Sequence, residues 1–189
     1  KYSNIMPYIH LPLQSGNDEI LRRMNRRYNS NEYRILFDKL KKAIPGCAFT
    51  TDIIVGFPNE SDEAFEDTLK MVDYCQYDNA FTFIYSPREG TPAAKYENLL
   101  TEEEKHDRLN RLVEKTNQGY LKGHERFLGQ VVKVLVDGPS KNNPEFMTGY
   151  SEHRKVVNFK PIKASVGDIV NVKITEAKTW FMNGEQVDE

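Results

Sequence analysis

The fold of this chain is indicated most clearly by residues 50–60, whose sequence is TTDIIVGFPNE. Its first part, residues 50–55, is a β-branched run with one carboxylate inside it, Asp52, and the run breaks at Gly56 and Pro58. This pattern predicts a buried strand that runs into a tight loop. Side chains alternate between the faces of a strand, so Asp52, Ile54 and Gly56 are expected on one face. A carboxylate in a buried strand needs a partner, either a hydrogen bond of the core or a ligand.

The composition is that of an ordinary globular chain: 189 residues, 29% charged and 39% hydrophobic, with a net charge of -2. This length suggests one large or two small domains, and the charge balance neither requires nor excludes nucleic acid. No apolar run is long enough to span a membrane, and no secretory signal is recognisable. Cys47 and Cys75 lack the spacing of metal ligands and are expected to be reduced thiols, which favours a cytoplasmic location.

Three apolar segments, 7–13, 50–55 and 79–85, alternate with amphipathic helical patterns in the first hundred residues. The helices are expected to begin after Asn17, after a cap at Ser30 or Asn31, and at residues 60–62. Their predicted buried positions are Tyr33, Leu36, Phe37 and Leu40 in the second helix, and Phe65, Leu69 and Val72 in the third. Connections of this length predict parallel strands joined by right-handed crossovers, which is an α/β arrangement.

Parallel strands place their carboxyl ends at one edge of the sheet, where α/β proteins bind ligands. Gln14, the turn at 56–58 and residues 85–88 each follow a predicted strand, so we expect them to share this rim. A nearby group of four arginines comprises Arg22, Arg23, Arg26 and Arg27. Three of the four are interpreted as a solvated helix face. The rim predicts a site but does not identify its ligand.

The second half of the chain changes character. A capping box at 101–104 predicts a long helix whose apolar face comprises Leu109, Leu112, Val113, Thr116 and Tyr120. Five short strand patterns follow, at 130–136, 146–150, 156–159, 168–174 and 180–182, and they predict a small antiparallel barrel.

This tail holds eight Lys or Arg and eight Asp or Glu, so any nucleic-acid surface on it is local. The candidates are the cations His153, Arg154, Lys155 and Lys160, with the rings of Tyr150 and Phe159 placed to stack on bases. The alternative is an accessory barrel with scattered surface charge and no RNA-binding role.

Four motifs together resemble the radical S-adenosylmethionine methylthiotransferases: HLPLQSGND at 10–18, MNRRY at 24–28, TDIIVGFPNE at 51–60 and FIYSPREGTPAA at 83–94. The MiaB-type tRNA enzymes are the most similar branch. The resemblance implies transfer of a methylthio group to carbon 2 of an N6-isopentenyladenosine beside the anticodon, at position 37. The tail, with GYSEHRKVVNF at 149–159, resembles the RNA-binding TRAM domain of these enzymes.

The implied fold class is α/β: a partial parallel (β/α) barrel, formed by the last three strands of a radical SAM barrel, in residues 1–126. A small all-β antiparallel barrel, the OB-like TRAM domain, is expected in residues 127–189. Three strands leave open sheet edges, so the isolated chain is expected to self-associate or to be only partly ordered in its first hundred residues.

The family's cofactor contacts can be placed on matching residues. In the wider superfamily an amide, an arginine and an aspartate contact S-adenosylmethionine, and Gln14, Arg26 and Asp52 have the matching spacing. Arg26 would pair with the cofactor carboxylate, and Asp52 would accept from ribose hydroxyls or the amino group. The backbone of Val55, Gly56 and Phe57 would lie beside the adenine, where glycine permits close approach. Arg88 would face the substrate from the rim.

The chain also departs from the family pattern. Such enzymes carry two 4Fe-4S clusters, and the cysteine ligands of neither are present, since Cys47 and Cys75 match no cluster motif. We therefore expect a carboxy-terminal fragment that is inactive alone, without catalytic or metal-binding residues of its own. Arg154 stands where the TRAM pattern has Asn, which weakens the case for sequence-specific RNA contacts there.

The expected partner is the anticodon stem-loop of tRNA, with no membrane partner. Two enzyme alternatives stay open, namely methylthiotransferases acting on threonylcarbamoyl-adenosine in tRNA or on a ribosomal-protein aspartate. A non-catalytic RNA-binding module is the third. It would not need Gln14, Arg26 and Asp52 at cofactor spacing.

Overall fold

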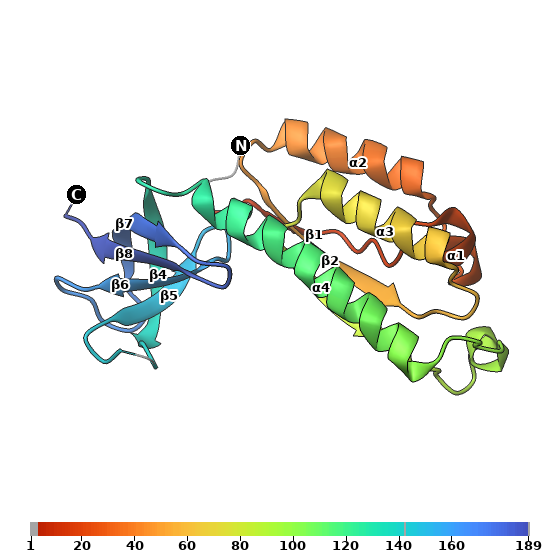
Figure 1. The fold of residues 1–189 in the computed structure, drawn as a ribbon. Helices are drawn as coiled ribbons and strands as arrows, with labels where there is room; N and C mark the ends of the chain where they lie inside the picture. The colour runs from red at the N-terminus through yellow and green to blue at the C-terminus, as the bar shows by residue number, and fades with distance from the viewer. Residues whose placement is uncertain (1–3, 142, 189) are drawn as a thin grey trace. The chain divides into compact units, whose positions relative to one another are not determined.

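The structure is a computed structural model that describes residues 4–141 and 143–188. Two compact units are present: residues 10–119, and residues 4–9 together with 120–188. In chain order the first elements are β1 (Tyr8–His10), α1 (Asp18–Arg23), α2 (Ser30–Ala43), β2 (Ala48–Val55), α3 (Asp62–Cys75), β3 (Asn79–Ile84), the 3-10 turn η1 (Pro92–Lys95) and α4 (Glu102–Glu125) (Figure 1). The remaining elements are β4 (Val131–Pro139), β5 (Met147–Ser151), β6 (Val156–Lys160), β7 (Ile169–Ala177) and β8 (Met182–Gln186).

The first sheet has the order β1-β2-β3, and β2 and β3 are parallel from Thr50 opposite Asn79 to Val55 opposite Ile84. The barrel is closed in the order β4-β5-β6-β8-β7. A parallel sheet with helices followed by a small closed barrel confirms the fold class expected from the sequence.

The two faces of β2 differ as the alternation predicts. Phe49, Thr51, Ile53 and Val55 are all buried, and the Phe49 ring lies 4.7 Å from that of Phe37 on α2. On the opposite face Asp52 and Ile54 are only half-buried. Parallel sheets normally have both faces covered. Within the described residues the face that carries Asp52 is buried at Ala48 and Thr50 and becomes more accessible only at Asp52 and Ile54.

The first strand is shorter than predicted, because residues 7–13 form a strand only from Tyr8 to His10. Pro12 has no N–H to donate to a ladder, so regular pairing cannot continue through it. The Leu13 N–H instead donates to the side-chain hydroxyl of Thr51 at 2.8 Å. Pairing with β2 resumes at Gln14, which forms an isolated parallel bridge with Ile53.

The cap and part of the buried face of α2 were predicted wrongly. Its cap is Asn29, which forms a capping box with Glu32, rather than Ser30 or Asn31. A reciprocal box satisfies two backbone donors at once, which a lone cap cannot do. Tyr33 and Phe37 are buried as predicted, Leu40 is half-buried, and Leu36 is 45% exposed.

The other helices follow their predictions. The Asn17 side chain caps α1 by accepting from Glu19 N and Ile20 N. Ser61 caps α3, which buries Phe65, Leu69 and Val72. At the start of α4, Thr101 Oγ1 accepts from Glu104 N at 3.2 Å and Thr101 N donates to the Glu104 carboxylate at 2.7 Å, a complete capping box.

The barrel encloses one apolar core, formed by Phe127, Val134, Val136, Val157, Phe159, Val172, Ile174 and Met182. Neighbouring strands are antiparallel except β6 and β8, which are parallel. The last strand was predicted at 180–182 but begins at Met182, and Trp180 lies before it with 61% of its surface exposed. Position 149 requires glycine, because a Cβ there would lie 2.2 Å from the Leu135 carbonyl oxygen.

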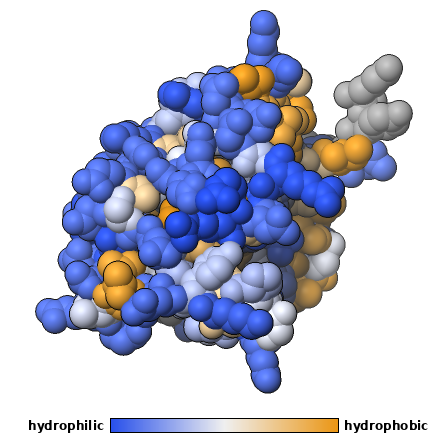
Figure 2. Space-filling view, turned by 90° about the vertical axis from the view of Figure 1, so that its right-hand side faces the viewer, coloured by the Kyte–Doolittle hydropathy of each residue, from blue (hydrophilic) through white to orange (hydrophobic). Residues whose placement is uncertain are grey.

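Polar side chains cover most of the face seen in Figure 2, and apolar atoms gather mainly near its right-hand edge. Scattered exposed apolar side chains are normal on protein surfaces. Among residues 4–141 and 143–188, no helix combines the length and apolar character that crossing a membrane requires.

Phe159 was predicted as a base-stacking residue, but it has no exposed surface and belongs to the barrel core. Replacing it with alanine should lower the free energy of unfolding of the barrel by about 3–5 kcal/mol, because it leaves a cavity. Tyr150→Ala is the control, since this side chain is 44% exposed and its loss should cost about 1 kcal/mol or less. Urea unfolding followed by the fluorescence of Trp180, the single tryptophan, measures both. Equal midpoints for Phe159→Ala and the wild type would contradict the assignment.

Candidate functional site

Gln14 and Asp52 are brought together at the rim by adjacent backbone. Gln14 N donates to the Asp52 carbonyl oxygen at 2.8 Å, and Ile54 N donates to the Gln14 carbonyl oxygen at 2.9 Å. Gln14 is buried and has a φ of 67°, in the left-handed region. That conformation costs about 1–3 kcal/mol for a residue other than glycine and occurs often at functional sites. Gln14 is thus held in an unfavourable conformation directly beside Asp52.

The Asp52 side chain lies on the partly covered face of the sheet and not in a sealed core. Its carboxylate is 30% exposed, and its Oδ2 lies 3.4 Å from Nε2 of His10. His10 Nδ1 is in turn 2.9 Å from the Thr50 hydroxyl. The prediction of a buried strand carboxylate is therefore corrected, because the cover on this face of β2, complete at Thr50, is only partial at Asp52 and Ile54. Sequence reasoning also missed His10 as a neighbour of Asp52, although it belongs to the first motif.

The turn at Gly56 is fixed by the chain itself. Gly56 has a φ of 71°; its N–H donates to the Glu60 carboxylate at 2.7 Å, and its carbonyl accepts from Asn98 at 2.9 Å. A Cβ at this position would lie 2.8 Å from Cγ of Lys105. Glycine is therefore required here by its positive φ and by the close approach of Lys105, whereas the sequence suggested close approach of a cofactor.

Val55 and Phe57 flank this turn with side chains that belong to the core. Val55 is fully buried, and Phe57, 3% exposed, packs in a cluster with Ile20 and Ala64. The Phe57 ring lies 4.8 Å from that of Tyr85. The backbone carbonyls of Val55 and Phe57 are also occupied, because they accept from Tyr85 N at 2.8 Å and from Glu60 N at 2.9 Å.

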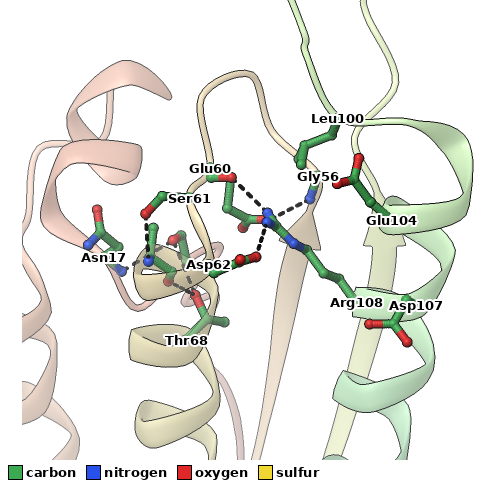
Figure 3. Close-up of polar contacts among 12 residues, drawn as sticks. Asn17, Gly56, Glu60, Ser61, Asp62, Thr68, Leu100, Glu104, Asp107 and Arg108 are labelled. Atoms are coloured by element: carbon green, nitrogen blue, oxygen red, sulfur yellow. Dashed lines mark hydrogen bonds and ion pairs between the residues drawn. The ribbon is translucent and has the colours of Figure 1, made fainter.

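A buried ion pair lies behind the turn (Figure 3). The Glu60 side chain is fully buried, and Arg108 of α4 donates to its carboxylate at 2.9 Å and to its backbone carbonyl at 2.8 Å. The second guanidinium nitrogen of Arg108 reaches Asp62 at 2.8 Å. Burial raises the pKa of Glu60, although the Gly56 amide and Arg108 act in the opposite direction.

Arg108 was absent from the predicted helix face. Its position, with Leu112 and Thr116 at four-residue spacing along the buried side of α4, was the available signal. The partner, Glu60, is too distant in sequence for the pairing to be inferred from that pattern.

The remaining predicted cofactor and substrate residues lie in exposed segments. Arg26 follows α1, and Arg88 lies in the loop after β3, where its carbonyl accepts from Thr91. Among the residues that the structure describes, no contact joins Arg26 or Arg88 to Asp52. Arg22 and Arg23 pair with Glu19 at 2.7 and 2.8 Å, and these bonds lower the pKa of Glu19 to about 2. They form the solvated face that was expected.

The chain's own side chains do not fit an iron–sulfur cluster. In the described part of the chain, no group of three or more His, Cys, Asp or Glu side chains is arranged to hold a metal ion. Cys47 and Cys75 are both buried thiols. Burial raises the pKa of Cys75 to about 12, which disfavours the thiolate that such clusters require.

Only some of the residues predicted to form an RNA surface on the tail are exposed. Tyr150, Arg154 and Lys160 are exposed, but Lys155 is 5% exposed and Phe159 is in the core. The reason is strand alternation, because Lys155 has the inward phase of Val157 and Phe159. The His153 ring packs against Phe127, with ring centroids 4.8 Å apart. Lys155 and Phe159 are therefore corrected from surface to interior positions.

An exposed apolar row that the sequence did not suggest runs across three barrel strands. Leu135 on β4 lies opposite Tyr150 on β5 and opposite Ile169 on β7. Their exposed fractions are 49%, 44% and 69%. Lys133, two residues before Leu135, is the next exposed side chain along β4. The alternation of outward and inward side chains along β4 was the sequence signal that could have identified this row.

Two sequence families match the chain. The profile of the Radical SAM superfamily matches residues 1–72, and that of the TRAM domain matches residues 125–187. The chain is therefore similar to part of the radical SAM superfamily over residues 1–72 and to the TRAM domain over residues 125–187.

The chain is also similar over its whole length to curated proteins named tRNA-2-methylthio-N(6)-dimethylallyladenosine synthase. The identity is 53% with the protein from Anoxybacillus flavithermus, 52% with that from Bacillus cytotoxicus and 51% with that from Bacillus anthracis. All 189 residues are aligned in each case, but they cover only 36% or 37% of the relative. The chain thus spans little more than a third of the length of these proteins, and the resemblance to the methylthiotransferases is confirmed.

Glu60 should make the stability of the first unit depend on pH. Because its pKa is raised in the folded protein, the carboxyl contributes stability below its ordinary value of 4.5, and this contribution is lost as pH rises through the folded pKa. Glu60→Gln removes the titration, so the stability of the variant relative to the wild type should rise as pH increases above 4.5. Urea unfolding followed by far-UV circular dichroism, which reports the helices, measures the difference. Parallel pH profiles for the two proteins would refute this role.

Proposed function

We propose that this chain is part of a radical SAM tRNA methylthiotransferase, a transferase that adds a methylthio group to carbon 2 of N6-isopentenyladenosine 37. The observation that carries the proposal is the alignment of all 189 residues with relatives of that name. The chain corresponds to the carboxy-terminal part of such an enzyme and is inactive alone. Its domain division is proposed at 126/127, supported by the start of the TRAM match at residue 125 and of β4 at Val131.

The proposed cofactor site comprises Gln14, Arg26, Asp52 and the backbone of Val55, Gly56 and Phe57. Asp52 suits this role because its carboxylate is accessible on the partly covered sheet face and would accept hydrogen bonds from ribose hydroxyls or the amino group. S-adenosylmethionine would supply the radical and group-transfer chemistry. The two 4Fe-4S clusters would take their ligands from outside these 189 residues. Arg88 is proposed to face the substrate.

The proposed partner is the anticodon stem-loop of tRNA, in the cytoplasm. On the TRAM barrel, Arg154 and Lys160 would contact phosphates, and Tyr150 would stack on a base beside Leu135 and Ile169. β3 is an outer strand of the described sheet, whose order is β1-β2-β3. Such an edge favours self-association of the isolated chain.

The first test of the RNA proposal titrates this chain with an anticodon stem-loop that has adenosine after the anticodon. Binding should be micromolar at about 50 mM salt and weaken steeply as salt rises, because phosphate contacts release counterions. The double variant Arg154→Glu with Lys160→Glu should bind at least about tenfold more weakly. The matched control, Lys39→Glu with Lys42→Glu, makes the same charge change on exposed positions of α2. Equal losses in both variants, or no binding at low salt, would contradict RNA recognition by the barrel.

The second test concerns the cofactor and uses the full-length protein that carries this chain, purified anaerobically. Asp52→Asn should weaken S-adenosylmethionine binding by about tenfold or more, because it removes charge-assisted hydrogen bonds. Equilibrium dialysis measures the dissociation constant. The control is Asp38→Asn, a substitution of the same kind on α2, away from the rim. An unchanged affinity in Asp52→Asn would favour a non-catalytic RNA-binding module.

A further inference from the structure

We propose that His10 is a positioning residue that holds the Asp52 carboxylate in the orientation that the cofactor site requires. This inference rests on the proposed function, because it assigns a task to Asp52 within that site. It concerns a side chain that the sequence analysis did not place in the site.

Three neighbouring strands each contribute to the arrangement. His10 comes from β1, Thr50 and Asp52 from β2, and Phe81 from β3. The imidazole is anchored through Nδ1, 2.9 Å from the Thr50 hydroxyl, and its Nε2 lies 3.4 Å from Asp52 Oδ2. Phe81 is the register partner of Asp52, and its ring meets that of His10 edge-on at 6.1 Å between centroids.

The hydrogen-bond directions follow from this geometry. An ionised carboxylate only accepts, so Nε2 must carry the hydrogen that points at Asp52. In the neutral imidazole Nδ1 is then the acceptor, and the Thr50 hydroxyl donates to it. The Asp52 carboxylate thus selects the tautomer, the Thr50 hydroxyl matches it by donating to Nδ1, and His10 binds one oxygen of Asp52. The other oxygen, Oδ1, has no protein hydrogen bond among the described residues and is available to a ligand.

Stability alone does not account for this contact. The side chains of His10 and Asp52 are 38% and 30% exposed, and ion pairs at such positions contribute little to folding. A carboxylate that is free to rotate loses that freedom when a ligand binds, which weakens the affinity. A carboxylate already fixed by a neighbouring strand avoids this loss. The arrangement therefore suits ligand binding better than it suits folding.

The contact itself can be tested on this chain by 15N NMR of its histidine rings. Asp52→Asn should change the ring 15N shifts of His10, because the charged acceptor is lost. His106 is the internal control, since it lies on α4 and contacts the Glu102 carbonyl instead. An unchanged His10 signal in a folded Asp52→Asn variant would overturn the proposal.

The positioning role is tested on the full-length protein by the dissociation constant of S-adenosylmethionine. In His10→Asn the amide nitrogen takes the place of Nδ1, so it still reaches Thr50 but no longer reaches Asp52. This variant should bind S-adenosylmethionine about fivefold more weakly than the wild type. His10→Gln places its amide nitrogen near Nε2 and should stay within about twofold of the wild type. In the Asp52→Asn background His10→Asn should cause no further loss, because the two residues act as one unit.

The outcomes separate the inference from the proposed function. Suppose that the wild type binds the cofactor. If the loss of affinity in the double variant then equals the sum of the losses in His10→Asn and Asp52→Asn, expressed as free energies, His10 acts independently of Asp52 and the inference fails. The inference also fails if His10→Gln loses as much affinity for S-adenosylmethionine as His10→Asn does. If the wild type binds no S-adenosylmethionine, the proposed function itself fails, and the role of His10 in it falls too, whatever the NMR contact shows.

Discussion

The buried carboxylate of Glu60 is the constraint on which the rest of the α/β unit depends. A charge without access to water needs several partners, and Glu60 obtains them from the Gly56 amide and from Arg108. These bonds join three segments: the end of β2, the start of α3 and the first turns of α4. The turn after β2 therefore has a defined shape before any ligand is present, and α4 is held against the unit by charge as well as by apolar contacts.

Asp52 and Glu60 are two carboxylates of one short segment that differ in their exposure to water. Asp52 lies on the partly covered face of the sheet, where water and ligands reach it. Glu60, eight residues later, is fully buried and stabilises the fold through its ion pair with Arg108. The difference follows from position, because Asp52 lies within β2 and Glu60 lies in the turn that Arg108 of α4 covers. A single sequence motif thus combines an accessible carboxylate with one that fixes the turn after the strand.

Local patterns in the sequence were enough to predict the parallel sheet and the barrel, whereas Gln14 and Asp52 were related to each other only through the family resemblance. Strand periodicity and caps are local signals, and parallel pairing places successive strand ends together. Lys155 and Phe159 were misplaced because the cationic cluster was judged by composition and not by its phase along β6. The pairing of Arg108 with Glu60 could not be predicted, since it joins residues 48 positions apart. Arg26 and Arg88 lie on exposed segments whose conformation no periodicity defines.

The order of strands in the barrel bears on how the protein is made. β8 is the last barrel strand in sequence, yet it lies between β6 and β7. While the chain emerges from the ribosome, β4 to β7 can pair only as an open sheet with two free edges. Closure waits until residues 182–186 have left the exit tunnel, so the nascent barrel passes through an interval in which its core is open to water. During that interval the incomplete barrel is the part of the chain most in need of protection by chaperones.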